Sequence, residues 1–305
     1  MMSSLPEGEG LAARYPADRG IRDDPAVVFA DDFEATPTGL IPPGIRRGEQ
    51  KKWDNSWGPC LVTEDPQSVH SGRKGLELTV IWDPERPRGG MSVQKHFEQG
   101  FDRLFLRYYA KFGAHAELYH GGVHNGASIA GRAPAMPPIA PGIRADGGNQ
   151  FIARLDTWRP GDEVPSPGDL VAYVYHMDQG GRWGDQFFPS GRVNPPGREL
   201  FGEHFVSRED FIPERGRWYC YELMVKANAP GARDGRIAFW VDGQLRADFG
   251  NLRLRNVESL KANRIDLTFG VATWRVKSDA TMCYDDVVAA TSYIGPQAPD
   301  EQPRR

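Results

Sequence analysis

Two tyrosines near the middle of the chain are spaced so that they share one face of a β-strand. Tyr173 and Tyr175 stand two apart in the run DLVAYVYHM, and side chains two apart on a strand point the same way. Ala172 and Val174, which alternate with them, are small and apolar and suit a core-facing side. The tyrosines are therefore expected to face outward, where a phenol hydroxyl is available for binding or proton transfer.

A charged face of the same kind is expected on the preceding strand, QFIARLDTW. Arg154, Asp156 and Trp158 share one side of it with Ile152, and Gln150 opens the strand on that side. The alternate positions are apolar and suit a core. A face that carries arginine, aspartate and tryptophan is typical of a polar groove with an aromatic wall.

A glycine-rich segment, LYHGGVHNGAS, adds His120, His124 and Asn125. Histidine titrates closest to neutral pH, which makes the two histidines candidates for acid or base chemistry. The HGGVH spacing would also suit a pair of metal ligands, but no third ligand is evident, so no catalytic metal is expected. His176, beside the tyrosines, is expected on the core side or at the end of its strand.

Composition excludes several classes of partner. The chain has 305 residues and a formal net charge of -4, which gives no general attraction to nucleic acid or anionic membranes. No apolar run approaches the roughly 18 residues of a membrane span. The first residues lack an apolar signal core, so the protein is secreted or periplasmic if a signal was removed and cytoplasmic if the sequence is complete. Cys60, Cys220 and Cys283 follow no metal spacing and are expected to be buried or free thiols.

The elements that must position these residues are short strands. From residue 27 onward, runs rich in Val, Ile, Phe, Tyr and Trp recur between turn signals, and VDGQL is a strong hairpin signal. Long helical patterns are nearly absent. We expect an all-β domain of two packed sheets over residues 27–295, a loosely packed arm over residues 1–26 and a disordered tail over residues 296–305.

The later part of the chain resembles a known group of enzymes. The segment GRWYCYELMVKANAPGARDGRIAFWVDGQL is similar to the jelly-roll polysaccharide lyases, above all the family-14 alginate and glucuronate lyases and the family-20 glucuronan lyases. The similarity extends over roughly residues 27–295. It implies a concanavalin A-like, two-sheet antiparallel jelly-roll sandwich and an acidic polysaccharide as partner.

The active strands of those lyases carry Gly-Gly-Lys, Ser-x-Arg and Tyr-x-Tyr segments. In GGVHNG the residue at the lysine position is Val123, and in FIAR the residue at the serine position is Ile152. Arg154 matches the arginine, and Tyr173 and Tyr175 match both tyrosines. Three of the five positions therefore agree with the pattern.

The matched residues fit β-elimination on a polymer that contains uronic acids, such as alginate or glucuronan. This reaction removes the proton beside a carboxylate, so it needs a group that stabilises the charge developing on that carboxylate. Arg154 offers a two-pronged, permanently charged contact, and Asn125 is placed to share that role. Gln150, Asp156 and Trp158 are further candidates for contacts with the sugar.

The reaction also needs a base and an acid. Tyr173 or Tyr175 can serve if Arg154 lowers a phenol pKa from its ordinary value near 10. His124 or His120 is the other candidate base. His124 replaces the missing lysine only if the glycine-rich segment bulges, because adjacent residues on a regular strand face opposite ways.

Three alternatives stay open at this point. The losses at Val123 and Ile152 favour a noncatalytic carbohydrate-binding sandwich, in which the tyrosines only pack or stack. Glycoside hydrolysis needs two carboxylates that face each other, and no ExDxxE-like strand is present, so hydrolysis ranks below elimination. The acidic pairs Asp31/Asp32 and Asp285/Asp286 would meet if the terminal strands pair, which makes a structural calcium conceivable; no other cofactor is expected.

Overall fold

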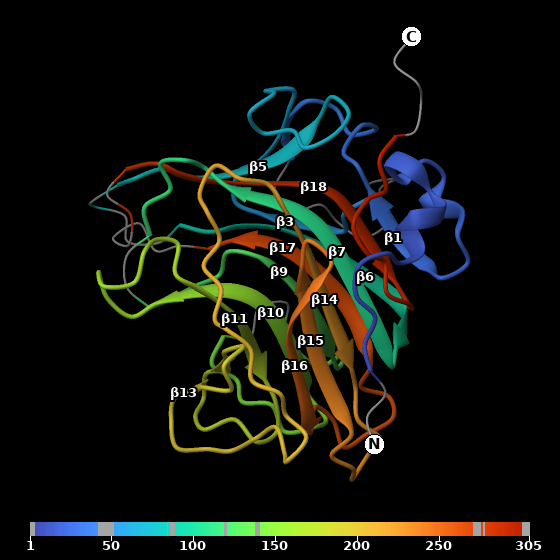
Figure 1. Ribbon diagram of the computed structural model, residues 1–305, viewed down its shortest axis with the longest axis vertical. Helices are drawn as coiled ribbons and strands as arrows, with labels where there is room; N and C mark the ends of the chain where they lie inside the picture. The colour runs from blue at the N-terminus through green and yellow to red at the C-terminus, as the bar shows by residue number, and fades with distance from the viewer. Residues whose placement is uncertain are drawn as a thin grey trace.

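The structure is a computed structural model that describes residues 4–41, 52–83, 85, 89–118, 121–137, 141–270, 276 and 278–300. Within these ranges the chain forms antiparallel strands, and its helical segments are short 3-10 turns. None of the helical segments in the described ranges is long and apolar enough to cross a membrane. The expected all-β architecture is therefore confirmed, and Figure 1 shows its two layers of strands.

The first layer, sheet A, holds the strands from the two ends of the domain. In spatial order it contains β16 (Gln244–Leu252), β15 (Gly235–Val241), β14 (Tyr219–Lys226), β7 (Arg103–Phe112), β18 (Ala280–Ala290), β5 (Gly75–Val80), β4 (Cys60–Thr63) and β2 (Gly39–Ile41). β1 (Val27–Asp31) also pairs with β18, so the first and last strands meet as expected.

The second layer, sheet B, carries the strands on which the sequence places its polar faces. In spatial order it contains β13 (Val193–Asn194), β12 (Asp185–Phe187), β11 (Asp169–Tyr175), β10 (Gln150–Arg159), β9 (Ala127–Arg132), β17 (Ala262–Phe269), β6 (Met91–Phe101) and β3 (Asn55–Trp57). β8 (Gly121–Val123) pairs with the far end of β10.

Strict alternation divides each strand of sheet B between the core and the outer face. On β10, Phe151, Ala153 and Leu155 belong to the core between the sheets. Leu170, Ala172 and Val174 of β11 do the same, and so do Ile265, Leu267 and Phe269 of β17. Burial of these apolar side chains fixes the register, because a slip of one residue would turn every charged side chain inward. The tyrosines and Arg154 therefore point outward, as the alternation predicts.

The VDGQL hairpin joins β15 to β16 as expected. Asp242 and Gly243 both have positive φ, 50° and 77°, as a tight two-residue hairpin turn requires. The three cysteines are free and buried, which confirms their expected state.

The N-terminal segment differs from the loosely packed arm expected from sequence. Residues 4–26 form three 3-10 turns, Leu11–Arg14, Pro16–Asp18 and Ile21–Asp23, which lie against the side of the sandwich next to β1 and β18 (Figure 1). Leu11 and Ile21 are buried in a second apolar cluster with Trp240 on the outer face of sheet A. That face carries apolar side chains, and the N-terminal segment shields them from water. Residues 296–300 also differ from a disordered tail, since Gln297 N donates to Tyr109 Oη at 2.9 Å and Asp300 pairs with Arg19 at 2.5 Å.

An ion pair anchors this cover. Arg107 of β7 lies on the outer face of sheet A and is fully buried, and its Nη2 atom bonds Asp18 of the second 3-10 turn. The Arg107 guanidinium also lies 5.5 Å from the ring centroid of Tyr109. A buried cation that loses its partner is strongly destabilising, so the segment is coupled to the stability of the whole sandwich.

We therefore expect Asp18→Asn to lower the free energy of unfolding by about 3 kcal/mol, because it leaves the buried Arg107 charge without its carboxylate. Urea denaturation at neutral pH measures the change. The matched control is Asp23→Asn, at an exposed position in the next turn, which should change stability by less than about 0.5 kcal/mol. Equal effects of the two variants would contradict the anchoring role of Asp18.

Candidate active site

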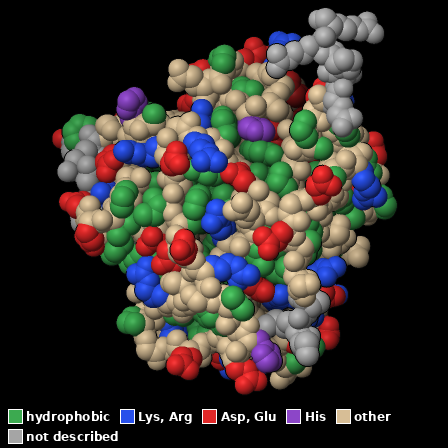
Figure 2. All heavy atoms as spheres, viewed as in Figure 1, with side chains coloured by type: hydrophobic (Ala, Val, Ile, Leu, Met, Phe, Trp, Pro, Cys, Tyr) green, Lys and Arg blue, Asp and Glu red, His purple; other side chains and the backbone are tan. Residues whose placement is uncertain are grey.

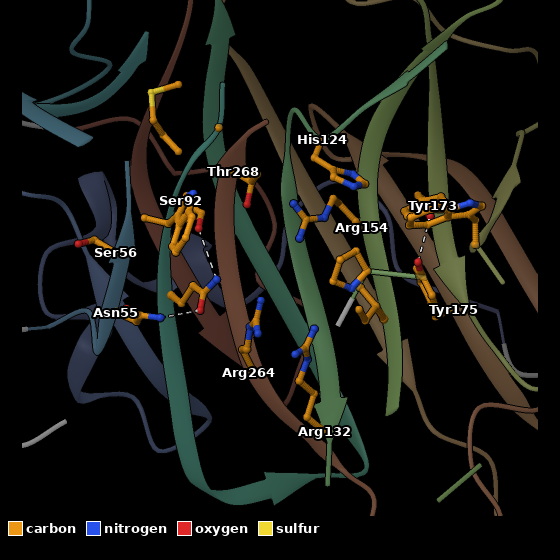
Figure 3. Close-up of a pocket in the computed structure, with 17 residues that line it drawn as sticks. Asn55, Ser56, Ser92, His124, Arg132, Arg154, Tyr173, Tyr175, Arg264 and Thr268 are labelled. Atoms are coloured by element: carbon orange, nitrogen blue, oxygen red, sulfur yellow. Dashed lines mark hydrogen bonds between the residues drawn. The ribbon is translucent and has the colours of Figure 1, made fainter. Parts of the chain in front are cut away.

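A groove of about 620 Å³ lies on the outer face of sheet B. Its floor comes from β11, β10, β9, β17, β6 and β3, and Figure 3 shows the side chains that point into it. The described lining residues are Asn55, Ser56, Trp57, Gly90, Met91, Ser92, Gln94, His124, Arg132, Pro141, Ile152, Arg154, Tyr173, Tyr175, Trp183, Arg264 and Thr268. The groove therefore joins aromatic walls to a polar, arginine-rich floor.

Strand register places the central polar residues in one row across the sheet. Arg154 lies opposite Tyr173 on β11 and opposite Ser128 on β9. Asp266 of β17 lies opposite Ser128 and, on its other side, opposite Gln94 of β6. Neighbouring strands are about 4.8 Å apart, so this row crosses the groove from the tyrosines to the polar side chains of β6.

A buried carboxylate holds the arginines of the floor. Asp266 Oδ1 lies 2.9 Å from Arg154 Nη2, and Asp266 Oδ2 lies 3.0 Å from Arg264 Nη2. Ser128 Oγ donates to the same carboxylate at 2.7 Å. Burial opposes ionisation of Asp266, but the two guanidinium charges and the Ser128 bond outweigh it and hold the pKa of Asp266 well below its usual range. Asp266 thus stays charged and fixes both arginines.

Arg154 has unused hydrogen-bonding capacity toward a ligand. Burial lowers its pKa, but the charges of Asp266 and Asp156 outweigh burial and raise it, so the guanidinium stays protonated. Its Nη1 atom is buried and has no hydrogen-bond partner among the described residues. Buried polar groups nearly always have a partner, and a carboxylate in the groove would supply one.

His124 reaches the groove through a bulge. Arg154 and Thr157 are three positions apart on β10, whereas their partners, Ser128 and Val123, are five apart. The segment between β8 and β9 therefore contains two extra residues, which is the irregularity that the sequence argument required. His124 lines the groove with about half of its side chain exposed.

A carboxylate orients the His124 ring. Asp156 Oδ2 lies 2.9 Å from His124 Nδ1, and Asp156 Oδ1 accepts from the backbone N of Asn125 at 3.1 Å. When Nδ1 carries the ring proton and donates a hydrogen bond to the carboxylate, Nε2 holds a lone pair and is free to act as a base. The ring centroid of His124 lies 5.3 Å from that of Tyr173, so base and phenol border the same part of the groove.

The tyrosine hydroxyls face the groove and also hold two loops. Tyr173 Oη accepts from Gly184 N, and Tyr175 Oη accepts from Gly142 N, each at 3.1 Å. The two hydroxyls lie 3.4 Å apart. Burial, followed by the bond to Tyr175, raises the pKa of Tyr173 well above its ordinary value. The expectation that Arg154 brings the pKa below its ordinary value is therefore wrong for Tyr173, because burial outweighs the arginine charge. Tyr173 is suited to donate a proton rather than to accept one.

Two residues that were expected to contact the substrate make hydrogen bonds within the protein instead. Asn125 is buried and uses both ends of its amide on Thr157, with Nδ2 donating to Oγ1 at 2.6 Å and Oδ1 accepting from N at 2.8 Å. Gln150 is fully buried, and its Nε2 donates to Ile143 O at 2.6 Å. Neither lines the groove, because neighbouring backbone needs these amides as partners.

The other site residues predicted from the sequence also lie outside the described groove lining or outside the described residues. Asp156 lies beneath His124 rather than in the lining, so it acts on the ring and not on the sugar. Trp158 is half-buried opposite Gly122 and Asp169, beyond the groove lining. His176 is buried, as expected on the core side, and its Nε2 lies 2.7 Å from Asp185. His120 lies outside the described residues.

Other lining residues were not singled out from the sequence. Arg132 and Arg264 occupy the floor, and Trp57 and Trp183 are large, exposed side chains at its rims. The run RIDLTF carried the signal for Arg264 and Asp266, because its charged residues alternate with apolar ones. The tryptophans lie in short or irregular segments without a periodic pattern.

The acidic pairs at the chain ends, Asp31/Asp32 and Asp285/Asp286, bond other protein groups. Asp31 accepts from Lys52 Nζ at 2.6 Å and from Trp53 Nε1 at 2.8 Å. Asp286 faces His70 Nδ1 at 2.7 Å. In the described part of the chain, no group of three or more His, Cys, Asp and Glu side chains is arranged to hold a metal ion. A structural calcium ion at these carboxylates stays a prediction.

Known proteins resemble this chain in structure rather than in sequence. No family model and no curated protein matches the sequence. A double mutant of alginate lyase Aly36B, in complex with alginate tetrasaccharide, has a TM-score of 0.59 at 17% identity, over 88% of this chain and 98% of its own. The chain has the fold of these lyases.

Two further lyase structures support the same jelly-roll sandwich. The marine PL-14 alginate lyase from Aplysia kurodai has a TM-score of 0.54 at 17% identity, over 87% of this chain and 99% of its own. The endo-β-1,4-glucuronan lyase from the fungus Trichoderma reesei has a TM-score of 0.53 at 14% identity, over 87% and 95%. The expected concanavalin A-like fold is thus confirmed, and function must be argued from the groove itself.

The ion pairs of Asp266 predict a pH-dependent loss of stability. Asp266→Asn should lower the free energy of unfolding by about 3–5 kcal/mol at pH 7, because Arg154 and Arg264 lose their shared buried carboxylate. The pKa of Asp266 is lower in the folded state, so its contribution is complete above the unfolded value near 4 and declines as pH falls below it. Denaturant titrations of both proteins should show the stability gap narrowing below about pH 4.

The control is Asp162→Asn, which removes an exposed carboxylate paired with Arg159 at 3.6 Å. It should have little effect at any pH. A gap between wild type and Asp266→Asn that stays constant down to pH 2 would contradict the depressed pKa of Asp266.

Proposed function

We propose that the protein is a polysaccharide lyase that cleaves a uronic-acid-containing polysaccharide, of the alginate or glucuronan type, by β-elimination. The observation that carries the proposal is that a histidine, an arginine and a tyrosine border one point of one groove. His124 is oriented by Asp156, Arg154 is opposite Tyr173, and Tyr173 is beside His124. The likeness in fold to alginate and glucuronan lyases supports the same substrate class.

Arg154 neutralises the substrate carboxylate. The proton to be removed is acidic only when the negative charge that develops on the adjacent carboxylate is stabilised. Arg154 lines the groove and its Nη1 atom has no partner among the described residues, so we assign its guanidinium to that carboxylate, while Asp266 holds its Nη2 atom. Because Arg154 is already fixed, little ordering is required when the substrate binds.

His124 and Tyr173 then divide the proton transfers. Nε2 of His124 takes the proton from C5 of the uronic acid, and the electron pair of that bond forms the C4–C5 double bond. The bond from C4 to the bridging oxygen breaks, and Tyr173 gives its phenol proton to the departing sugar oxygen. The raised pKa of Tyr173 keeps the phenol protonated until that step. Tyr175 bonds the Tyr173 hydroxyl and positions it.

A noncatalytic carbohydrate-binding sandwich is the second candidate. Ile152 lines the groove at a position where the similar lyases carry a serine, and Val123 stands where they carry a lysine. Both changes remove polar groups, as would suit a groove that only binds sugar. The oriented His124–Asp156 pair has no evident use in such a protein, and for this reason we favour the lyase.

The proposal predicts an unsaturated product. Incubation with alginate, glucuronan and other polyuronates should generate the ultraviolet absorbance of a new C4–C5 double bond with at least one of them. His124→Ala and Tyr173→Phe should each lower kcat on that polymer by about 10²-fold or more, because each removes a proton-transfer group. His204→Ala, at an exposed position remote from the groove lining, should retain the wild-type rate.

The same experiment separates the two candidates. Sugar binding without any unsaturated product from the wild type would favour the binding module. Near-normal turnover in both His124→Ala and Tyr173→Phe would contradict the assigned roles even if product forms.

A further inference from the structure

One glutamine is buried inside an otherwise exposed loop. Polar side chains usually stay in contact with water, and Figure 2 shows basic and acidic groups interspersed over the face in view. Gln179 differs, since it is 1% exposed although residues 180–183, which follow it, are exposed. It belongs to the loop 176–184, which joins β11 to β12. Burial of an amide costs free energy unless its polar atoms are hydrogen-bonded, so the partners of Gln179 indicate what it does.

Both polar atoms of the Gln179 amide are bonded to the backbone. Oε1 accepts from His176 N and from Ala145 N, each at 3.2 Å. Nε2 donates to Gly181 O at 3.0 Å and to Trp183 O at 2.9 Å. These partners fix the orientation of the amide, because two of them are donors and two are acceptors. The glutamine thus braces its own loop from within and ties it to the loop that precedes β10.

One of these bonds leads to the proposed proton donor. Trp183 O and Gly184 N belong to one peptide group, here called the 183–184 peptide group. It accepts from Gln179 at its oxygen and donates to Tyr173 Oη, at 3.1 Å, from its nitrogen. A peptide group that accepts a hydrogen bond at its oxygen becomes a stronger donor at its nitrogen, because hydrogen bonds in a chain polarise one another. Gln179 therefore acts on the Tyr173 hydroxyl through a single peptide group.

The bond from Gly184 gains strength as Tyr173 gives up its proton. In the proposed elimination the phenol O–H bond breaks, the proton goes to the departing sugar oxygen, and a phenolate remains until water supplies a proton. Burial raises the pKa of Tyr173 and opposes formation of this anion, whereas the bond from Gly184 N lowers that pKa. A hydrogen bond to an anionic oxygen is about twice as strong as one to a neutral oxygen. The donor consequently stabilises the transition state more than the ground state.

We propose that Gln179 is a positioning residue for the proton donor: it holds and polarises the 183–184 peptide group, whose N–H stabilises Tyr173 as the proton leaves. This inference rests on the proposed function, in which Tyr173 protonates the leaving sugar. It gives Gln179 no contact with the substrate. The relay does not include the base, His124, so the step that depends on Gln179 is protonation of the leaving group.

Two substrates that differ in the leaving group test this role. One is a uronic-acid oligomer that the wild type cleaves, in which the departing sugar oxygen needs a proton. The other carries nitrophenoxide in place of that sugar at C4, and nitrophenoxide departs as a stable anion. Gln179→Met keeps the length of the side chain and removes its hydrogen bonds. It should lower kcat about 10-fold on the first substrate but less than about 2-fold on the second, and leave KM within about 2-fold on both.

Three further variants frame the result. Tyr173→Phe removes the donor itself and should show the same selectivity with a larger loss. Gln179→Glu keeps an acceptor for the two backbone N–H groups but its carboxylate cannot donate to Trp183 O, so it should show the selective loss as well. The matched control is Gln150→Met, which removes another buried amide that bonds a loop carbonyl, Ile143 O. It should affect the two substrates equally.

An amide resonance reports the relay without turnover. In protein labelled with nitrogen-15 glycine, the Gly184 N–H proton signal should move upfield in Gln179→Met, because the donor is less polarised. It should stay in place in Gln150→Met. Equal losses on both substrates in the Gln179 variants, no loss on either, selectivity in Gln150→Met or an unmoved Gly184 signal would each overturn the proposal.

The outcome is distinct from that of the lyase proposal. If the wild type yields no unsaturated product from any polyuronate or from the nitrophenoxide substrate, the elimination chemistry fails and Gln179 loses its assigned role, even if the Gly184 signal moves. If product forms but both leaving groups respond alike to Gln179→Met, the chemistry stands and the positioning role fails.

Discussion

The groove depends on the ionised carboxylate of Asp266. Sheet B presents two guanidinium groups on the face of closely packed strands, where water screens them poorly, and these charges would repel each other without a counter-charge between them. Asp266 supplies that charge from β17, and Ser128 and Thr268 hold its oxygens. With one side of each arginine fixed in this way, the other side is oriented before any ligand arrives. Preorganised charge of this kind stabilises a developing anion more effectively than a mobile side chain does.

The alternation of polar and apolar residues was enough to predict the sandwich and the outward faces of β10 and β11. Period-two patterns are reliable in this chain because one face of each strand lies against a shared core, which leaves a single permitted register. Arg154, Tyr173 and Tyr175 were therefore placed correctly in the groove. The same reasoning applied to RIDLTF would have placed Arg264 there as well, since its neighbours Ile265 and Leu267 are core residues.

Sequence reasoning failed where position depends on contacts between segments. Asn125 and Gln150 have side chains of the type that binds sugars, but their amide groups form hydrogen bonds with the backbone of other segments. The bulge that presents His124 appears only when the pairings of β8 and β9 with β10 are compared. The N-terminal segment has a polar, Pro/Gly-rich composition, and its few apolar residues were sufficient to cover the outer face of sheet A. None of these outcomes follows from local pattern alone.

The Tyr173 hydroxyl accepts a hydrogen bond from the backbone N–H of Gly184, and the Tyr175 hydroxyl accepts one from that of Gly142. Each glycine lies in a loop and directly follows a residue that lines the groove, Trp183 and Pro141 respectively. These loops form part of the groove wall, and a Cβ atom at Gly184 would lie 2.7 Å from Val174 O. Binding residues lie disproportionately on loops that a rigid scaffold positions, so a change of ligand would involve such loops. In this protein, replacing either loop removes the backbone N–H that holds a tyrosine hydroxyl in position. Substrate range and turnover therefore cannot be engineered as independent traits.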